Sequence, residues 1–141
     1  MFKTILFPLD HSREAREAAQ MVADLVTIHQ SKLILLSVVE TPPNDDKADP
    51  DPTPPHGMAS PEDVAKLLQG AKALFAQKGI ETDVIEREGM PSFTICDVAD
   101  EVNADLIVMG CRGLGLTAEG ASESVTSRVI NLSPCPVLVV P

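Results

Sequence analysis

The chain has 141 residues, of which 44% are hydrophobic, and this length predicts one domain, residues 1–141, with a full core. Acidic residues outnumber basic ones by 21 to 11, which gives a formal net charge of −10. Because affinity for nucleic acid rests largely on Lys and Arg that neutralise phosphates, this charge argues against a nucleic-acid partner and against an anionic membrane surface.

The first part of the chain predicts a strand, a helix and a second strand. Residues 2–9 form an apolar, partly β-branched run that ends before Asp10. Ser12 is placed to cap a helix, because apolar side chains behind it recur at three- and four-residue spacing. This stripe comprises Ala15, Ala18, Ala19, Val22, Leu25 and Val26. Residues 32–39 (KLILLSVV) follow as a second buried strand.

Residues 41–59 differ in composition from the rest of the chain. They hold six of the 12 prolines, several aspartates and few apolar residues. This composition predicts a mobile loop beside the ligand-binding edge, although a solvated linker without a role would have the same composition. His56 is interpreted as a surface residue, since no second His or Cys lies at ligand spacing from it.

A second helix is predicted to begin at Pro61, with Ser60 as its cap and Asp63 at the position of a capping-box acid. Its apolar stripe comprises Val64, Leu67, Leu68, Ala71, Leu74 and Phe75. Gly79 is predicted to end this helix. Residues 80–88 alternate between apolar and polar side chains, as expected of an edge strand with one face in water.

The remaining elements complete an alternating pattern. A third helix is marked by Ile95, Val98, Ala99 and Val102. A last helix is expected from Ser122 to about Asn131, with an apolar stripe of Val125, Val129 and Leu132. Residues 106–109 and 136–140 form the fourth and fifth strands. Five strands alternating with four helices predict an α/β fold, an open five-stranded parallel sheet with helices on both faces. In such sheets ligands bind outside the carboxyl ends of the strands, where the strand order reverses.

The most informative segment lies within residues 105–129. A buried strand leads into a loop that contains Gly110, Gly113, Gly115 and Gly120, and a helix follows. This arrangement can hold phosphate, because backbone N–H groups and the positive end of a helix dipole point to one place. A long, tight connection without a ligand would explain the same glycines, so both interpretations stay open.

The cysteines and the lengths of the apolar runs bear on the cellular compartment of the protein. Cys96, Cys111 and Cys135 are far apart and form no CxxC motif, which favours reduced thiols in the cytoplasm over disulfides or a zinc site. Cys111 beside Arg112 is a candidate for oxidation, although a space-filling role is the more common one. Residues 5–9 are too few for a signal peptide, and no segment approaches 18 apolar residues, so we expect no membrane insertion.

Several enzyme classes lack their residues in this sequence. There is no GxxxxGK[ST] phosphate loop, and none of the three histidines has a placed nucleophile. Asp10 stands alone where a receiver domain needs clustered acids, and the absence of Trp and Tyr argues against flavin binding. We therefore expect no catalytic residues and no enzyme, with slow ATP hydrolysis left open.

The chain resembles single-domain, UspA-like universal stress proteins over nearly all of its length. The resemblance is carried in order by residues 2–6 (FKTIL) before Asp10, 89–91 (GMP), 104–110 (ADLIVMG), 124–126 (SVT) and 134–140 (PCPVLVV). It implies the Rossmann-like fold of adenine nucleotide alpha hydrolase-like proteins. It also implies a cytoplasmic stress-response regulator that forms a homodimer through its C-terminal strand and contacts an unknown protein partner.

The resemblance further implies binding of an ATP-type or AMP-type adenine nucleotide (ATP, ADP or AMP), with or without Mg²⁺. ATP-binding members of the family carry GxxG, nine residues, then Gly followed by Ser or Thr. Here Gly110 and Gly113 supply the pair and Ser124 matches, but Glu123 replaces the third and last glycine of the motif. Its bulk and negative charge would oppose phosphate oxygens, and a bridging metal or fewer phosphates would relieve the conflict.

The nucleotide-binding residues implied by this resemblance are Pro8, Asp10, Val39, Met109, Gly110, Arg112, Gly113, Ser124 and Val125, with no metal ligand. Asp10 would accept hydrogen bonds from the ribose or from the adenine side, and it is equally suited to cap the first helix. Val39 is alternatively a core residue, and Arg112 a solvated loop charge. The competing function is a dimeric interaction module whose nucleotide pocket is degenerate.

Overall fold

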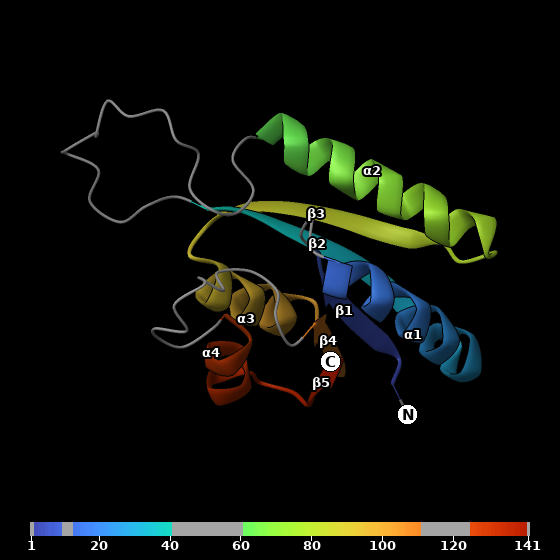
Figure 1. Cartoon of the computed structure of the whole chain (residues 1–141). Coiled ribbons are helices and arrows are strands. Elements are labelled where there is room, and N and C mark those ends of the chain that lie inside the picture. Colours follow the sequence, from blue (N-terminus) through green and yellow to red (C-terminus); the bar gives the residue numbers. More distant parts are fainter. Residues whose placement is uncertain (1, 10–12, 41–60, 111–124, 141) are drawn as a thin grey trace.

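The structure, a computed structural model, describes residues 2–9, 13–40, 61–110 and 125–140 (Figure 1). Within them, five strands form one parallel sheet in the order β3-β2-β1-β4-β5. The strands are β1 (Thr4–Pro8), β2 (Lys32–Glu40), β3 (Thr82–Gly89), β4 (Leu106–Gly110) and β5 (Val137–Val140). The helices are α1 (Arg13–His29), α2 (Pro61–Gln77), α3 (Pro91–Glu101) and α4 (Val125–Leu132).

Helices cover both faces of the sheet, as the sequence predicts. Figure 1 shows α1 and α2 on one face and α3 and α4 on the other. The first face buries a cluster that includes Ile5, Phe7 and Phe75, and the second buries a cluster around Leu6, Ile107 and Val129. Because neighbouring residues of a strand point to opposite faces, β1 supplies both clusters in alternation. The doubly wound α/β fold is therefore confirmed.

A carboxylate holds the amino ends of β1 and β4 together. Oδ2 of Asp105 accepts hydrogen bonds from the backbone N–H groups of Lys3 and Thr4, at 3.0 and 2.9 Å. The backbone N–H of Asp105 in turn donates to the carbonyl oxygen of Thr4 at 2.8 Å. Three hydrogen bonds therefore fasten the chain just before β4 to the start of β1, and β1 begins at Thr4 rather than at Phe2.

Both edges of the sheet agree with the sequence patterns. β3 is an edge strand whose exposed residues outnumber its buried ones, as the alternation of residues 80–88 predicts. β5 forms the other edge, and three of its four residues are half-buried although all are apolar. The second edge therefore leaves an apolar strand partly uncovered.

The helices deviate from the predicted stripes at two leucines. Leu74 and Leu132 are 45% and 47% exposed, so neither belongs to the core. In α2 the core-facing row passes through Phe75, and Leu74 lies about 100° away from it around the helix axis. The predicted end of this helix is correct, because Gly79 adopts φ 79° and its N–H donates to the carbonyl oxygen of Ala76.

Four predictions about the secondary structure fall on residues that the structure leaves undescribed. They are the caps at Ser12 and Ser60, the loop at 41–59 and the helix start at Ser122, since α4 is described from Val125. Among the described helices, none combines the length and the apolar character that crossing a bilayer requires.

Candidate functional site

The hydrogen-bonded ladder between the two central strands ends before their carboxyl ends. β1 pairs with β2 at five positions and β4 pairs with β5 at four, but β1 pairs with β4 only through Ile5↔Leu106 and Leu6↔Ile107. The strand order reverses between β1 and β4, since the chain proceeds outward from β1 in both directions. This is the point at which doubly wound sheets form a ligand crevice.

Pro8 explains why the β1–β4 ladder stops. The carbonyl oxygen of Lys3 and the N–H of Leu9 bond to β2, whereas the carbonyl oxygen of Thr4 accepts a hydrogen bond from Asp105, directly before β4. By this alternation the backbone of Pro8 faces β4, and proline has no N–H to donate. The next hydrogen bond of the ladder after Leu6 therefore has no donor on β1. Pro8 lies at the point where the ladder between the two strands ends.

β2 continues beyond the end of β1. The last paired residue of β1 is Pro8, opposite Leu36, while β2 runs on to Glu40. The N–H of Leu9 still donates to Leu36 at 2.8 Å, and the hydroxyl of Ser37 donates to the carbonyl of Leu9 at 3.3 Å. Val39 thus lies past the last strand pair with β1, and its side chain is buried in the core beneath α1 and α2.

A side-chain hydrogen bond joins the carboxyl end of β4 to the amino end of α4. The hydroxyl of Thr126, in the first turn of α4, donates to the carbonyl oxygen of Gly110 at 2.9 Å. Thr126 is only 5% exposed, so this bond is shielded from water. Met109, directly before Gly110, is buried among the side chains beneath α3 and α4. The carboxyl end of β4 and the amino end of α4 are therefore held side by side.

The corner between β3 and α3 reaches the same edge of the sheet. Gly89 ends β3 with φ 145°, and a Cβ at this position would lie 2.8 Å from the hydroxyl oxygen of Thr94. α3 begins directly afterwards with Pro91 in its first turn, and its N-cap, Met90, makes no side-chain cap hydrogen bond. Glycine is required here both by the backbone conformation and by the close approach of Thr94.

The structure brings five of the predicted site residues to this edge of the sheet. Pro8, Val39, Met109 and Gly110 lie at the carboxyl ends of β1, β2 and β4, and Val125 is the first residue of α4. The other predicted site residues, together with two residues discussed above, lie outside the described ranges: Asp10, Arg112, Gly113, Ser124, Cys111 and Glu123.

Thr126 and Gly89 were not among the predicted site residues. Both have a recognisable signal in the sequence. A hydroxyl residue in the first turn of a helix can bond to the strand that precedes it, and a glycine between a strand and a proline marks a tight corner. Both residues lie in motifs that carry the family resemblance, residues 89–91 and 124–126. Their physical roles, however, depend on contacts that the motifs themselves do not reveal.

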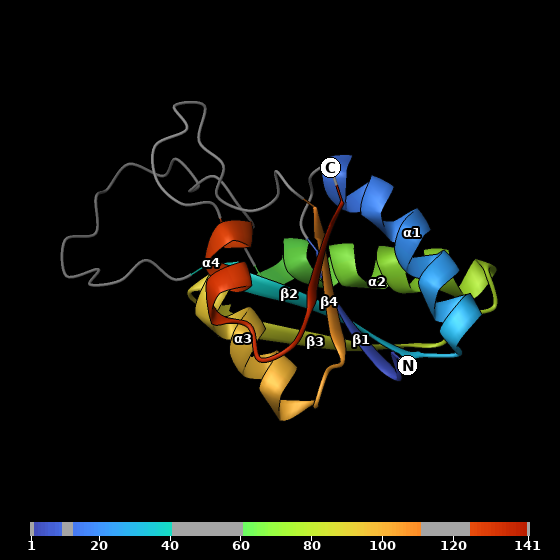
Figure 2. The same cartoon turned by 90° about the horizontal axis from the view of Figure 1, so that it is seen from below.

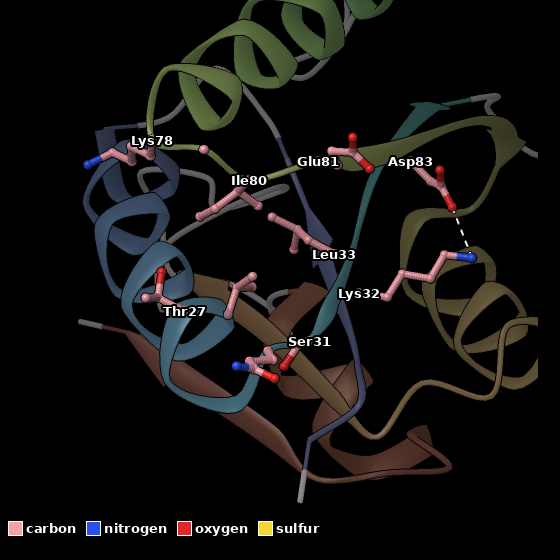
Figure 3. Close-up of a pocket in the computed structure, with 11 residues that line it drawn as sticks. Thr27, Ser31, Lys32, Leu33, Lys78, Ile80, Glu81 and Asp83 are labelled. Carbon is pink, nitrogen blue, oxygen red and sulfur yellow. Dashed lines mark ion pairs between the residues drawn. The ribbon is translucent and has the colours of Figure 1, made fainter.

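Two hollows on the described surface lie at the opposite end of the sheet. One of about 680 Å³ opens beside the amino ends of β2 and β3, with Leu33 and Ile80 in its lining (Figure 3). An exposed ion pair between Lys32 and Asp83, at 3.0 Å, lies on its rim. A second hollow of about 560 Å³ adjoins it, and the two share Gly79, Ile80, Glu81 and Asp83 in their linings. Neither contains a residue of the carboxyl edge, so we do not assign the nucleotide site to them.

The described part of the chain contains neither a cluster of metal-binding side chains nor a cysteine with a lowered pKa. No group of three His, Cys, Asp or Glu side chains there is arranged to hold a metal ion. Burial raises the pKa of Cys96, and Asp97 and Cys135 raise it further. Burial also raises the pKa of Cys135, against the effect of its hydrogen bond from Ser133. These two thiols are therefore mainly protonated at neutral pH.

The strand order, which reverses between β1 and β4, and the helices on both faces define a doubly wound, Rossmann-like α/β protein. The chain belongs to the universal stress protein family, because the sequence model of that family matches residues 1–141.

Individual relatives agree with this assignment. The chain is 77% identical over 142 residues to the universal stress protein Sll1654 of Synechocystis, covering 100% of this chain and 87% of the relative. The structure of protein MJ0577, whose biochemical function was assigned from its structure, superposes with a TM-score of 0.78 at 28% identity, covering 99% and 96%. A universal stress protein in complex with cAMP gives 0.76 at 26%, covering 99% and 97%.

Proposed function

We propose that the protein is a regulator that binds an adenine nucleotide between the carboxyl ends of β1 and β4. The observation that carries this proposal is the end of the β1–β4 ladder after Leu6, at the point where the strand order reverses. A relative of the same fold and family was crystallised with cAMP, which supports the class of ligand. Such a protein would act by changing its contacts with partners.

The described residues suggest how the site is divided. Pro8 and the backbone beyond the β1 end would border the base and ribose, and Gly110 would lie where the phosphates approach. Val125 and Thr126 form the first turn of α4, whose N–H groups favour negative charge. In this proposal Asp10, Arg112, Gly113 and Ser124 complete the site, with Arg112 directed to phosphate.

Glu123 bears on the number of phosphates. It occupies a position that is glycine in ATP-binding members of the family, so a triphosphate would meet an added carboxylate. Two like charges about 4 Å apart cost about 1 kcal/mol in water and several times more in a partly dry site. We therefore propose that the protein prefers a nucleotide with fewer phosphates, or takes ATP together with Mg²⁺.

A pair of glycine substitutions tests the proposed site. Gly113→Asp adds bulk and a negative charge at the phosphate end and should abolish binding of AMP in calorimetric titration. Gly70→Asp makes the same chemical change on α2, where a Cβ meets nothing within 4 Å, and should leave AMP affinity unchanged. Mass spectrometry of the purified protein would identify any retained nucleotide.

The experiment also separates the proposed function from its competitor. If the wild-type protein retains no nucleotide and binds neither AMP nor ATP with Mg²⁺, the proposal of a nucleotide-dependent regulator is wrong. The competing function, an interaction module with a degenerate pocket, is favoured specifically by Glu123. It predicts unchanged partner binding in Gly113→Asp.

We further propose that the protein works in the cytoplasm as a homodimer that pairs through β5. The support is the apolar edge strand, with Val137, Leu138 and Val139 half-buried on the described surface. An edge of this kind tends to pair with another strand. Val139→Lys should give monomer or aggregate in light scattering, and an unchanged dimer would remove β5 from the interface.

A further inference from the structure

The larger of the two hollows lies where α1 and α2 both end. α1 ends at His29 and α2 at Gln77, and Figures 1 and 2 show these ends at the same side of the molecule, away from the amino end of α4. Its volume of about 680 Å³ is within the usual range of small-molecule sites. We call it the amino-edge hollow. It lies beside the amino ends of β2 and β3, so it is separate from the proposed nucleotide site.

The floor of the amino-edge hollow is apolar. Its lining includes Leu33 and Ile80, which are 0% and 8% exposed. Leu33 lies at the start of β2 and Ile80 in the turn between α2 and β3. Figure 3 shows these two side chains next to each other, with Thr27 and Ser31 on one side of them and Glu81 on the other. An apolar floor with polar groups at both ends suits an elongated ligand.

The end of the hollow at Thr27 and Ser31 offers hydrogen-bond acceptors. The hydroxyl of Thr27 donates to the carbonyl oxygen of Ala23 at 2.8 Å, and the hydroxyl of Ser31 donates to the carbonyl oxygen of Phe2. Because each hydroxyl has one proton, both oxygens have only lone pairs left for a ligand. The carboxyl end of α1, the negative end of its helix dipole, lies beside them. This end of the hollow therefore favours a positively charged donor.

The opposite end holds a carboxylate and an unpaired hydroxyl. Glu81 is exposed, and its carboxylate forms no ion pair or hydrogen bond within the described ranges. Thr82 is only 7% exposed, and its hydroxyl has no hydrogen-bond partner in the same part of the chain. Thr82 pairs with Leu33 across the sheet, so its side chain lies on the same face, beside the apolar floor. A bound N–H group would give this hydroxyl a partner, which is favourable because an unpaired buried hydroxyl destabilises the protein.

The lysines around the hollow are directed elsewhere. Nζ of Lys32 forms an ion pair with Oδ2 of Asp83 at 3.0 Å, and Nζ of Lys78 donates to Oε1 of Gln20 at 3.0 Å. Figure 3 shows Lys78 pointing away from the floor of the hollow. Lys72 lines the adjoining hollow but not this one. The acceptors of the amino-edge hollow are therefore not occupied by these ammonium groups.

We infer that the amino-edge hollow binds a small aliphatic diamine, an organic cation with an ammonium group at each end. One ammonium group would donate to the hydroxyl oxygens of Thr27 and Ser31, and the other to Glu81 and Thr82. The methylene groups between them would pack on the apolar floor and leave water. An anion would instead meet a carboxylate and the negative ends of two helix dipoles.

Titration with 1,4-diaminobutane tests this site, with the amide chemical shifts of the full chain followed by NMR at constant ionic strength. We expect saturable shifts at Thr27, Ser31 and Glu81. Affinity should be about tenfold higher than for n-butylamine, which has a single ammonium group, and uncharged 1,4-butanediol should cause no shifts. The absence of saturable shifts at millimolar diamine, or equal affinity for the two amines, would overturn the inference.

A matched pair of variants separates this site from general attraction by the net charge of −10. Glu81→Gln should weaken diamine binding by about tenfold, because it removes the carboxylate of the site. Glu62→Gln makes the same change at an exposed residue in the first turn of α2, the end of that helix opposite to the hollow, and should leave the affinity unchanged. Equal effects of the two substitutions would show attraction by net charge alone and would contradict a specific site.

Thr82→Val distinguishes a ligand contact from a purely structural role. Valine keeps the shape of the side chain and removes the unpaired hydroxyl, so the free protein should unfold at a higher urea concentration. The same substitution should weaken diamine binding by about tenfold. A gain in stability with unchanged diamine affinity would remove Thr82 from the site and refute the diamine assignment.

Discussion

The hydroxyl of Thr126 lies 2.9 Å from the carbonyl oxygen of Gly110 and donates a hydrogen bond to it. This bond joins the first turn of α4 to the last residue of β4, two points that 16 positions of sequence separate. It fixes where the chain leaves the sheet and where the following helix begins. Both segments that flank the proposed phosphate-binding part of the site, the end of β4 and the start of α4, are thus held in place.

Thr126→Val should lower both stability and nucleotide affinity. The substitution keeps the side-chain shape but leaves a shielded carbonyl without its donor, so we expect a loss of about 1–2 kcal/mol in the free energy of unfolding. Thr126→Ser keeps the hydroxyl and should recover most of it. Urea titration of the three proteins measures the effect, and equal midpoints for Val and wild type would contradict it.

Asp105→Ala should destabilise the fold without a direct effect on ligand contacts. The carboxylate accepts from two backbone N–H groups at the start of β1, and both would lose their partner. We expect a loss of about 1–3 kcal/mol by thermal or chemical denaturation. Asp105→Asn retains one oxygen acceptor and should lie between the two. An Ala variant as stable as the wild type would show that water replaces the carboxylate fully.

Pro8→Ala should weaken nucleotide binding by extending the β1–β4 ladder into the proposed site. Alanine supplies the N–H that β1 lacks toward β4, so the ladder can extend by one rung. We expect AMP affinity to fall by about tenfold, or about 1.4 kcal/mol, with stability unchanged or raised. Pro136→Ala is the matched control, because Pro136 precedes β5 and its carbonyl bond to Ile107 survives the change. Slow hydrogen exchange of the new amide at position 8 would report the added rung.

Glu123→Gly should strengthen ATP binding more than AMP binding. Removing one close charge conflict is worth about 1–3 kcal/mol, which corresponds to roughly tenfold to a hundredfold in affinity. A single phosphate lies farther from this position, so AMP should gain much less. Titration of both proteins with each nucleotide, with and without Mg²⁺, decides the matter. Tight binding of metal-free ATP by the wild type would refute this role of Glu123.

Cys96 and Cys135 should react slowly with iodoacetamide at neutral pH. Burial first, and nearby negative groups after it, raise the pKa of both thiols above the ordinary value of 9.0. The reactive thiolate therefore forms only as the pH rises beyond that value, later than in an exposed cysteine. Rates measured between pH 7 and 10 in a Cys111→Ser background test this. Rates equal to those of glutathione at pH 7.5 would contradict it.

The order of elements could be read from the sequence because each element carries its own period. Buried parallel strands such as residues 32–39 are continuous apolar runs, and α1 shows a clear helical stripe. The errors concern single side chains. Leu74 fits a helical stripe by type, but it lies next to the core-facing row, and only the position of α2 on the sheet decides its exposure.

The candidate site was harder to predict, for a physical reason. Pro8 and Gly110 could be named because they stand at strand ends, which local pattern reveals. The contact of Thr126 with Gly110 and the end of the β1–β4 ladder depend on how distant segments of the chain meet. The local spacing of apolar residues does not predict such contacts. The role of Pro8 emerges only from the register, which determines which neighbour its missing N–H would have faced.

Asp105 fastens β1 to the start of β4, whereas the ladder between the two strands ends after Leu6 and Ile107. Toward Gly110 the two strands are therefore no longer tied to each other by strand pairing. Gly110 is also paired with Val140, the last described residue of the edge strand. A nucleotide that shifts the carboxyl end of β4 would therefore also shift β5, the strand through which two copies are proposed to pair. Nucleotide binding and dimerisation would then be coupled.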